Sequence, residues 1–172
     1  MLIGLAGRMG SGKDEVAKVL VREFGFTRVA FADAIKRMAE DINPYIESVG
    51  VNLLELLEWE DDDWDQAKKY PLVRSFLQRL GVAVRNQDPE FWLRAAGVTE
   101  GNVIVTDTRF LNEVDYILEH GGTMLRVVRP GTAVGTHISE TDLDVLLLDE
   151  LHNSGTLEEL AEKVRAYAAT LI

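Results

Sequence analysis

Cysteine is absent from the 172-residue sequence, and this absence excludes three kinds of chemistry. The chain cannot build a disulfide framework, offer a thiol nucleophile or bind a metal through thiolates. Long apolar runs are also lacking, since no stretch approaches the roughly 20 apolar residues that cross a bilayer. The sequence opens with a strand-like segment rather than a charged leader. We therefore expect a cytoplasmic protein without a membrane partner.

Positive charge is scarce, because 18 Lys and Arg residues face 29 Asp and Glu residues and leave a net charge of -11. A nucleic-acid polymer needs a broad basic face, so we expect none as a partner. Arginine nevertheless supplies 12 of the 18 basic residues. Its planar guanidinium suits bidentate phosphate contacts, and an acidic exterior around arginines suits a small anionic substrate. Several arginines lie in apolar or loop segments: Arg74, Arg79, Arg85, Arg109, Arg126 and Arg129.

Strand-like and helical segments alternate along the chain, which is long enough for one domain with a core. Strands are expected at residues 1–6, 27–31, 103–106, 123–128 and 146–152. Helices are expected at residues 15–24, from 34 onward, at 53–57, 72–81 and 111–120, from 88, and from 157 to the end. We expect Gly81 to end its helix, and the acidic run 59–65 to be a solvated loop. This alternation predicts an α/β fold with a parallel sheet covered by helices on both faces.

The first strand leads into the sequence GRMGSGKD at residues 7–14, which matches the Walker A phosphate loop except at its last position. Glycines let the backbone turn its N–H groups onto a polyanion, and the following helix adds its positive N-terminal end. Lys13 is expected to reach the β- and γ-phosphates. Asp14 replaces the usual hydroxyl that meets Mg²⁺, and it either helps to hold the metal or caps the helix. The pattern predicts binding of a nucleoside triphosphate, against the alternative of a glycine-rich turn that binds nothing.

Other candidate residues follow the later strands, where an open parallel sheet places its ligand crevice. Asp33, Lys36 and Arg37 follow the second strand. Asp107 follows the third, either as a second acidic group near Mg²⁺ or as a helix cap, and Arg109 is a candidate phosphate contact. Arg129 opens a loop at about 129–142 that we expect to act as a lid.

Four further residues each have two possible interpretations. His137 and Glu140 in the expected lid either contact substrate or order the loop. Phosphoryl transfer between two phosphates needs no strong general base, so neither is expected to act as one. Arg126 lies within a strand and faces either the cleft or solvent. Trp92 either stacks on a base or packs in the core.

Taken together, the motifs resemble the phage-type deoxynucleoside monophosphate kinases, which are P-loop enzymes of the nucleoside-phosphate kinase class. The resemblance covers most of the chain and rests on motifs whose order and spacing are more specific than the phosphate loop alone. They are GRMGSGKD (7–14), FADAIK (31–36), VRSFLQRLG (73–81), DPEFW (88–92), TDTRFLNEVD (106–115), RVVRPG (126–131), THISE (136–140) and HNSGTLEEL (152–160). The Lys-Asp pair in the loop also resembles this family.

The resemblance implies a three-layer P-loop kinase fold in one domain, with a helical acceptor-binding region at about 34–100 and a lid. It implies transfer of the ATP γ-phosphoryl group to deoxynucleoside monophosphates with Mg²⁺, and catalytic roles for Lys13, Arg109 and Arg129. ATP would contact Arg8, Gly10, Ser11, Gly12, Lys13, Asp14 and Glu15, with Asn153 and Gly155 near the adenine. The acceptor would be lined by Asp33, Lys36, Arg37, Arg74, Gln78, Arg85, Asp88, Trp92, Asp107, His137 and Glu140. Asp14 and Asp107 are the candidate Mg²⁺ ligands, directly or through water.

Two other functions fit parts of the pattern. A dephospho-coenzyme A kinase also ends in an NxGxLEEL-like segment, but it should carry Ser or Thr where this chain has Asp14. A nucleotide-dependent switch would bind a triphosphate without transferring it, yet the chain places arginines at several strand ends. If the protein is phage-encoded, its compartment is the host cytoplasm. The accepted bases, the discrimination against ribose, the role of residues 41–71 and the presence of a homodimer are left open by the sequence.

Overall fold

The computed structural model describes residues 1–97, 101–132 and 142–171. The chain divides into two compact units. Unit 1 comprises Met1–Phe31 and Gly97–Ile172, and unit 2 comprises Ala32–Ala96. No helix in the described part of the chain is long and apolar enough to cross a membrane.

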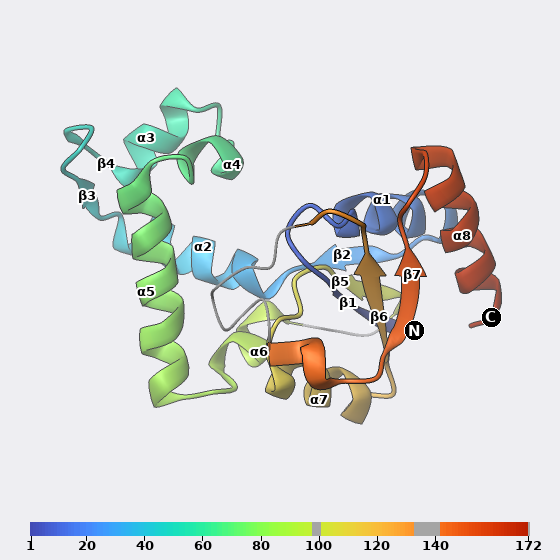
Figure 1. The fold of residues 1–172 in the computed structure, drawn as a ribbon. Coiled ribbons are helices and arrows are strands. Elements are labelled where there is room, and N and C mark those ends of the chain that lie inside the picture. The colour runs from blue at the N-terminus through green and yellow to red at the C-terminus, as the bar shows by residue number, and fades with distance from the viewer. Residues whose placement is uncertain (98–100, 133–141, 172) are drawn as a thin grey trace. The chain divides into compact units, whose positions relative to one another are not determined.

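Unit 1 is built on a five-stranded sheet in which every neighbouring pair of strands is parallel (Figure 1). The strands are β1 (Leu2–Ala6), β2 (Thr27–Val29), β5 (Val103–Val105), β6 (Thr123–Val128) and β7 (Asp149–His152). Their spatial order is β2-β5-β1-β6-β7. Every residue of β1 and β5 is buried, as expected for central strands covered on both faces. This order places the carboxyl end of β1 between those of β5 and β6.

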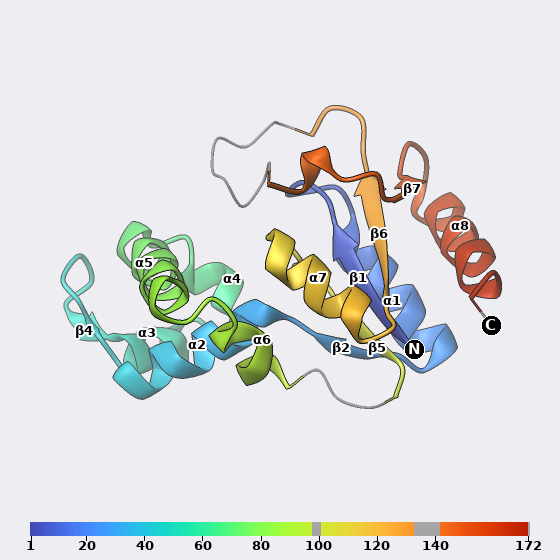
Figure 2. The same ribbon diagram turned by 90° about the horizontal axis from the view of Figure 1, so that it is seen from below.

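Helices cover both faces of this sheet (Figures 1 and 2). On one face α1 (Lys13–Phe24) and α8 (Leu157–Ala169) pack against Ile3 and Leu5. On the other face α7 (Leu111–Glu119) lies against β1 and β6. Gly4 has no side chain because a Cβ there would overlap Met124 and Ile117. The predicted three-layer α/β arrangement is therefore confirmed.

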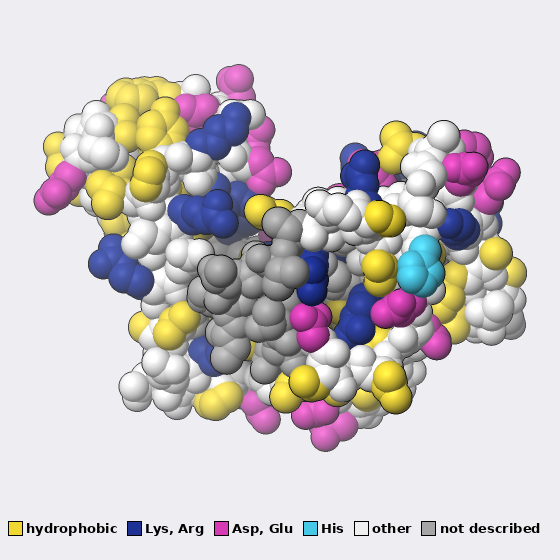
Figure 3. Space-filling model, viewed as in Figure 1, with side chains coloured by type: hydrophobic (Ala, Val, Ile, Leu, Met, Phe, Trp, Pro, Cys, Tyr) yellow, Lys and Arg dark blue, Asp and Glu magenta, His cyan; other side chains and the backbone are white. Residues whose placement is uncertain are grey.

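Unit 2 is mainly helical and has a core of its own, which centres on Leu53, Leu56 and Leu57. Its elements are α2 (Phe31–Ile42), β3 (Tyr45–Ile46), β4 (Val51–Asn52), α3 (Leu53–Trp59), α4 (Trp64–Ala67), α5 (Pro71–Gln87) and α6 (Phe91–Ala96). The short strands β3 and β4 pair as an antiparallel hairpin, which was not predicted from the sequence. Exposed apolar side chains gather over this hairpin and α3 (Figure 3).

Several predicted boundaries were wrong. The strand expected at 146–152 begins at Asp149, and the helix expected from 88 begins at Phe91. Packing explains two further differences. Helix α2 begins at Phe31 rather than near Ala34, because the Asp107 carboxylate accepts a hydrogen bond of 2.8 Å from the Phe31 N–H. Helix α5 continues to Gln87 instead of ending at Gly81. Gly81 is buried inside that helix, where its missing side chain leaves room for Ile35 of α2. A glycine that permits close helix packing cannot be distinguished in the sequence from a glycine that ends a helix.

The acidic run 59–65 is only partly the solvated loop that was expected. Asp61 and Asp62 are exposed and adopt left-handed backbone angles. Asp63, however, is the N-cap of α4, where its carboxylate accepts from the N–H groups of Asp65 and Gln66. The run therefore ends in an ordinary helix start.

Candidate active site

The phosphate loop occupies residues 7–12, between the end of β1 and the start of α1. Its first and last glycines are required by their surroundings as well as by their backbone angles. At Gly7, with φ of 135°, a Cβ would overlap the carbonyl oxygen of Val127 in β6. At Gly12, with φ of 104°, a Cβ would lie 2.5 Å from the Asn153 side-chain nitrogen. The first and last positions of the loop are thus packed against Val127 of β6 and Asn153, which follows β7, with no space for a side chain at either position.

Lys13 is the first residue of α1, and its ammonium group is folded back onto the loop. Its Nζ donates to the carbonyl oxygens of Gly7 at 2.7 Å and Arg8 at 2.9 Å. These contacts hold the positive charge within the loop, beside the N-terminus of α1. The combination of an ammonium group and a helix start favours an anion there.

The other expected ATP contacts in this stretch have different surroundings. Ser11 is buried, and within the described residues its hydroxyl has no hydrogen-bond partner. Gly10 is exposed. Gly12 occupies the N-cap of α1, so Asp14 is not the capping residue and lies exposed in the first turn. Glu15 forms an ion pair of 2.7 Å with Lys18.

A pocket of about 400 Å³ lies beside the loop within unit 1. It shares Gly7 and Arg8 with the loop and receives side chains from the ends of several elements. Four arginines line it, namely Arg8, Arg109, Arg126 and Arg129. Among the described residues, two acidic side chains line it, those of Asp144 and Glu150, so the arginines outnumber them. Such a lining suits a phosphorylated ligand.

Arg126 was expected to face either the cleft or solvent, and the structure favours the cleft side. Its side chain is only 17% exposed. The guanidinium donates to the carbonyl oxygens of Leu143 and Leu146 and lies 3.5 Å from a Glu150 carboxylate oxygen. Arg126 therefore holds η2 (Asp142–Val145) and the residue that follows it against β6.

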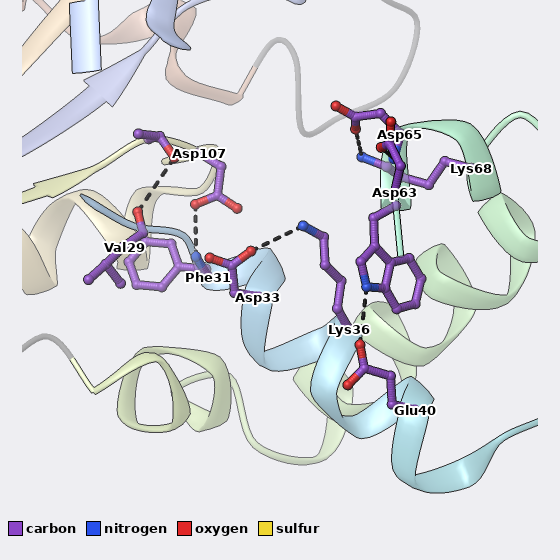
Figure 4. A network of polar contacts seen from close by, with 11 residues as sticks. Val29, Phe31, Asp33, Lys36, Glu40, Asp63, Asp65, Lys68 and Asp107 are labelled. Atoms are coloured by element: carbon purple, nitrogen blue, oxygen red, sulfur yellow. Dashed lines mark hydrogen bonds and ion pairs between the residues drawn. The ribbon is translucent and has the colours of Figure 1, made fainter. Parts of the chain in front are cut away.

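Asp107, Thr108 and Arg109 follow β5. One oxygen of Asp107 accepts from the Phe31 N–H, so Asp107 caps α2 rather than the helix after it (Figure 4). Thr108 lines the pocket, is only 3% exposed, and its hydroxyl has no hydrogen-bond partner among the described residues. Arg109 is exposed, and its backbone N–H donates to the buried Glu113 carboxylate at 2.7 Å. Glu113 thereby fixes the turn that presents Arg109.

Asn153 and Gly155 follow β7. Asn153 is 7% exposed, and its side-chain amide donates to the Ser11 carbonyl oxygen at 2.9 Å. Gly155 is exposed and lies beside the Glu159 carboxylate, which takes part in the Thr156–Glu159 capping box of α8. A position near the adenine stays a prediction for both.

Within unit 2, the acceptor candidates of α2 are tied to neighbouring groups. Asp33 and Lys36 form an ion pair of 3.1 Å (Figure 4). Arg37 donates to the Ala95 carbonyl oxygen of α6 at 3.0 Å.

The acceptor candidates of α5 lie on one side of that helix. Arg74, Gln78 and Arg85 are spaced by four and seven residues and so share a face. Arg74 and Gln78 are exposed, and Arg85 is half-buried.

Asp88 and Trp92 follow α5. Asp88 pairs with Arg94, whose hydrogen bond holds the pKa of the Asp88 carboxyl below its ordinary value. Trp92 is 1% exposed and its indole N–H donates to the Gly81 carbonyl oxygen at 3.0 Å. This burial favours the packing interpretation of Trp92 over base stacking.

A metal ion would have few protein ligands here. The described residues contain no cluster of three or more His, Cys, Asp or Glu side chains. Mg²⁺ often takes one or two carboxylates and completes its shell with substrate phosphates and water. Asp14 is exposed in the first turn of α1 and the Asp107 carboxylate accepts from the Phe31 N–H; for both residues a role as Mg²⁺ ligand stays a prediction. His137, Glu140 and most of the expected lid lie outside the described residues.

Thr108 and Asp144 are among the pocket residues to which the sequence assigned no role. Thr108 stands between two candidates that were chosen for their charge, and its position directly after a strand could have drawn attention to it. Asp144 lies 3.5 Å from Arg8, a contact between residues 136 positions apart that no local pattern could reveal.

The fold and the loop define the chain as a P-loop kinase. Shikimate kinase from Aquifex aeolicus has the same fold, with a TM-score of 0.51, 13% identity and coverage of 98% of this chain and 96% of that one. A family model described as deoxynucleotide monophosphate kinase matches residues 65–164. The chain belongs to this family, and it is accordingly a nucleotide kinase.

Viral relatives agree with this assignment. A protein of Acanthamoeba polyphaga mimivirus with the provisional name of deoxynucleotide monophosphate kinase is 29% identical over 95% of this chain and 94% of its own length. The deoxynucleotide monophosphate kinase of Escherichia phage RB69 is 31% identical over 72% of this chain and 51% of its own length. The deoxynucleotide monophosphate kinase of Enterobacteria phage T4 is 32% identical over 61% of this chain and 46% of its own length. The phage enzymes are therefore similar to this chain over about half of their length.

Proposed function

We propose that this protein transfers the γ-phosphoryl group of ATP to a deoxynucleoside 5′-monophosphate, with Mg²⁺ as the metal. The observation that carries the proposal is the juxtaposition in unit 1 of a lysine-bearing phosphate loop and an arginine-lined pocket, which share Gly7 and Arg8. A phosphate loop is sufficient to bind one nucleotide. Transfer of a phosphoryl group also needs positive charge around the phosphate that is transferred.

The reaction breaks the bond between the γ-phosphorus and the oxygen that bridges it to the β-phosphate. An anionic oxygen of the acceptor phosphate forms the new bond, and the electron pair of the broken bond leaves on ADP. No proton must be removed from the acceptor, so the mechanism requires no general base. Asp14 and Asp107 would hold Mg²⁺, directly or through water, and the metal would neutralise part of the charge on the ATP phosphates.

Lys13, Arg109 and Arg129 are the groups that we assign to the transferred phosphoryl. Lys13 leaves the Gly7 and Arg8 carbonyl oxygens for the β- and γ-phosphates as ATP enters. Arg109 and Arg129 supply guanidinium N–H groups to the equatorial oxygens, whose charge changes during transfer. The buried Thr108 hydroxyl offers a further donor in the same pocket. Unit 2 supplies the acceptor contacts in this proposal, among them the shared face of α5 that carries Arg74, Gln78 and Arg85.

A coupled assay of ADP release tests the proposal. The protein is incubated with ATP and Mg²⁺, alone and with each of dAMP, dCMP, dGMP, dTMP, the four ribonucleoside monophosphates and dephospho-coenzyme A. We expect ADP release that depends on at least one deoxynucleotide. Dependence on dephospho-coenzyme A instead, or ATP binding without any acceptor-dependent release, would replace this proposal with one of its alternatives.

Substitution of the loop lysine ties any activity to this site. Lys13→Ala should abolish transfer while the protein stays folded, as judged by circular dichroism. Lys18→Ala is the matched control, because Lys18 lies on the same helix and its ammonium group is exposed and paired with Glu15. Equal turnover by the two variants would show that the activity does not come from the phosphate loop.

A further inference from the structure

Asn153 links the last strand of the sheet to the phosphate loop through two hydrogen bonds of different kinds. It is the residue directly after β7, and its backbone N–H donates to the Val128 carbonyl oxygen at 2.7 Å. Val128 is the last residue of β6, so this bond fixes the backbone of Asn153 to the carboxyl end of that strand. The side-chain amide then reaches the loop, where it donates to the Ser11 carbonyl oxygen at 2.9 Å.

The loop is shaped to receive this side chain. Gly12 has a left-handed backbone and no Cβ, and a Cβ there would lie 2.5 Å from the Asn153 side-chain nitrogen and 3.7 Å from Leu160 of α8. Asn153 is 7% exposed. Asn153 thus lies against Ser11 and Gly12, at the peptide bond that joins these two residues.

The direction of that peptide bond decides where its N–H group points. A trans peptide is planar, with its C=O and N–H groups on opposite sides. The Ser11 carbonyl is directed at Asn153, and the N–H of Gly12 in the same peptide therefore points away from Asn153. An N–H group turned inward from a glycine-rich loop is the group that binds a phosphate oxygen. The hydrogen bond to the Ser11 carbonyl is therefore the contact through which Asn153 can set the direction of the Gly12 N–H.

We infer that Asn153 is a positioning residue that holds the Ser11–Gly12 peptide in its phosphate-binding orientation. The inference rests on the proposed function, and it differs from a contact with the adenine ring. A residue that orients the loop affects every polyphosphate equally, whatever base it carries. A residue that contacts the base affects ATP and leaves a ligand without a base unchanged.

Direct binding measurements separate these roles. We compare the Kd of ATP, GTP and inorganic tripolyphosphate for the wild-type protein, Asn153→Asp and Asn153→Ala, with Ser154→Ala as the exposed neighbouring control. Asn153→Asp keeps the size of the side chain but replaces the donor with an oxygen that repels the Ser11 carbonyl. Loss of one partner of a buried hydrogen bond costs about 1–3 kcal/mol, which corresponds to a roughly 5- to 150-fold weaker Kd.

We expect Asn153→Asp to weaken all three ligands by a similar factor of about tenfold or more. Asn153→Ala should have a smaller effect, since it removes the donor without adding repulsion, and Ser154→Ala should change nothing. Melting curves establish that each variant is folded at the temperature of the measurement. The ranking of the two variants at Asn153 remains informative if both are somewhat destabilised.

Two results would overturn the inference alone. Weaker ATP binding with unchanged tripolyphosphate binding would show that Asn153 contacts the base. Unchanged binding of all three ligands in folded variants would show that Asn153 contributes only to the stability of the fold. A wild-type protein that binds neither ATP nor tripolyphosphate would instead contradict the proposed function, and the inference would fall with it.

Discussion

Replacement of Trp92 by Phe tests whether this side chain belongs to the core or to the substrate. Trp92 is 1% exposed and donates to the Gly81 carbonyl oxygen at 3.0 Å. Phe retains most of the ring but loses the indole N–H, and a hydrogen bond of this kind contributes about 1 kcal/mol. Incomplete filling of the site adds about 1–2 kcal/mol, by comparison with small deletions in other cores. We expect the free energy of unfolding to fall by about 2–3 kcal/mol in total.

Thermal unfolding followed by circular dichroism measures this loss. In a chain of this size 1 kcal/mol shifts Tm by about 2–4 °C, so Trp92→Phe should melt about 5–10 °C below wild type. Trp59→Phe is the matched control, because Trp59 lies in the same unit with 56% of its surface exposed, and its Tm should hardly move. An unchanged Tm for Trp92→Phe, together with a raised KM for the acceptor, would refute the packing argument and restore base stacking.

Three further predictions concern charge. Ala at Arg109 or Arg129 should lower kcat by about 10²-fold while ATP still binds, because preorganised donors act on charge that develops during transfer. Asp14→Asn should raise the Mg²⁺ concentration needed for half-maximal activity, since it removes a charged ligand but little volume. The hydrogen bond from Arg165 lowers the pKa of Glu23, so this pair stabilises the fold above the ordinary pKa of the carboxyl and loses its effect as the pH falls through the lowered value. The Tm difference between wild type and Arg165→Gln should accordingly shrink between pH 6 and about pH 3.

Controls keep these outcomes distinct. Arg22→Ala removes an exposed arginine of α1 and should leave kcat unchanged. If both pocket variants also retain full kcat, the pocket is not where transfer occurs. An identical Mg²⁺ titration for Asp14→Asn would show that the metal is held without this carboxylate. A Tm difference that persists at pH 3 would mean that Arg165 stabilises the helices by packing rather than by its ion pairs.

Elements with a periodic pattern of buried residues were predictable from the sequence. The central strands β1 and β5 are short apolar runs, and the three-layer fold follows from the alternation of strands with helices. The failures occurred where a distant residue decides the structure. The start of α2 depends on Asp107, 76 positions away from Phe31, and the length of α5 depends on Ile35 beside Gly81. Local propensity contains no information about either partner.

The candidate site divides in the same way. The phosphate loop could be located because its backbone conformation requires glycine at particular positions, and these glycines are visible in the sequence. The role of a side chain such as Arg126 could not be read, because the sequence does not show which carbonyl oxygens lie opposite a strand. Asn153 was associated with the nucleotide through resemblance, yet its bond to Ser11 spans 142 positions and is visible only in the folded chain.

The position of β1 at the centre of the sheet has a consequence for the order of folding. Ile3 of β1 lies in register with Ile104 of β5 and Thr123 of β6, so both neighbours of the first strand are encoded about a hundred residues later. The core of unit 2 joins residues between 39 and 73 and therefore closes much shorter loops. Contacts between distant residues form slowly because loop closure costs entropy before the contacts compensate for it. During synthesis the apolar first strand must remain unpaired until β5 has left the ribosome, which makes it the segment of this chain most exposed to misassociation.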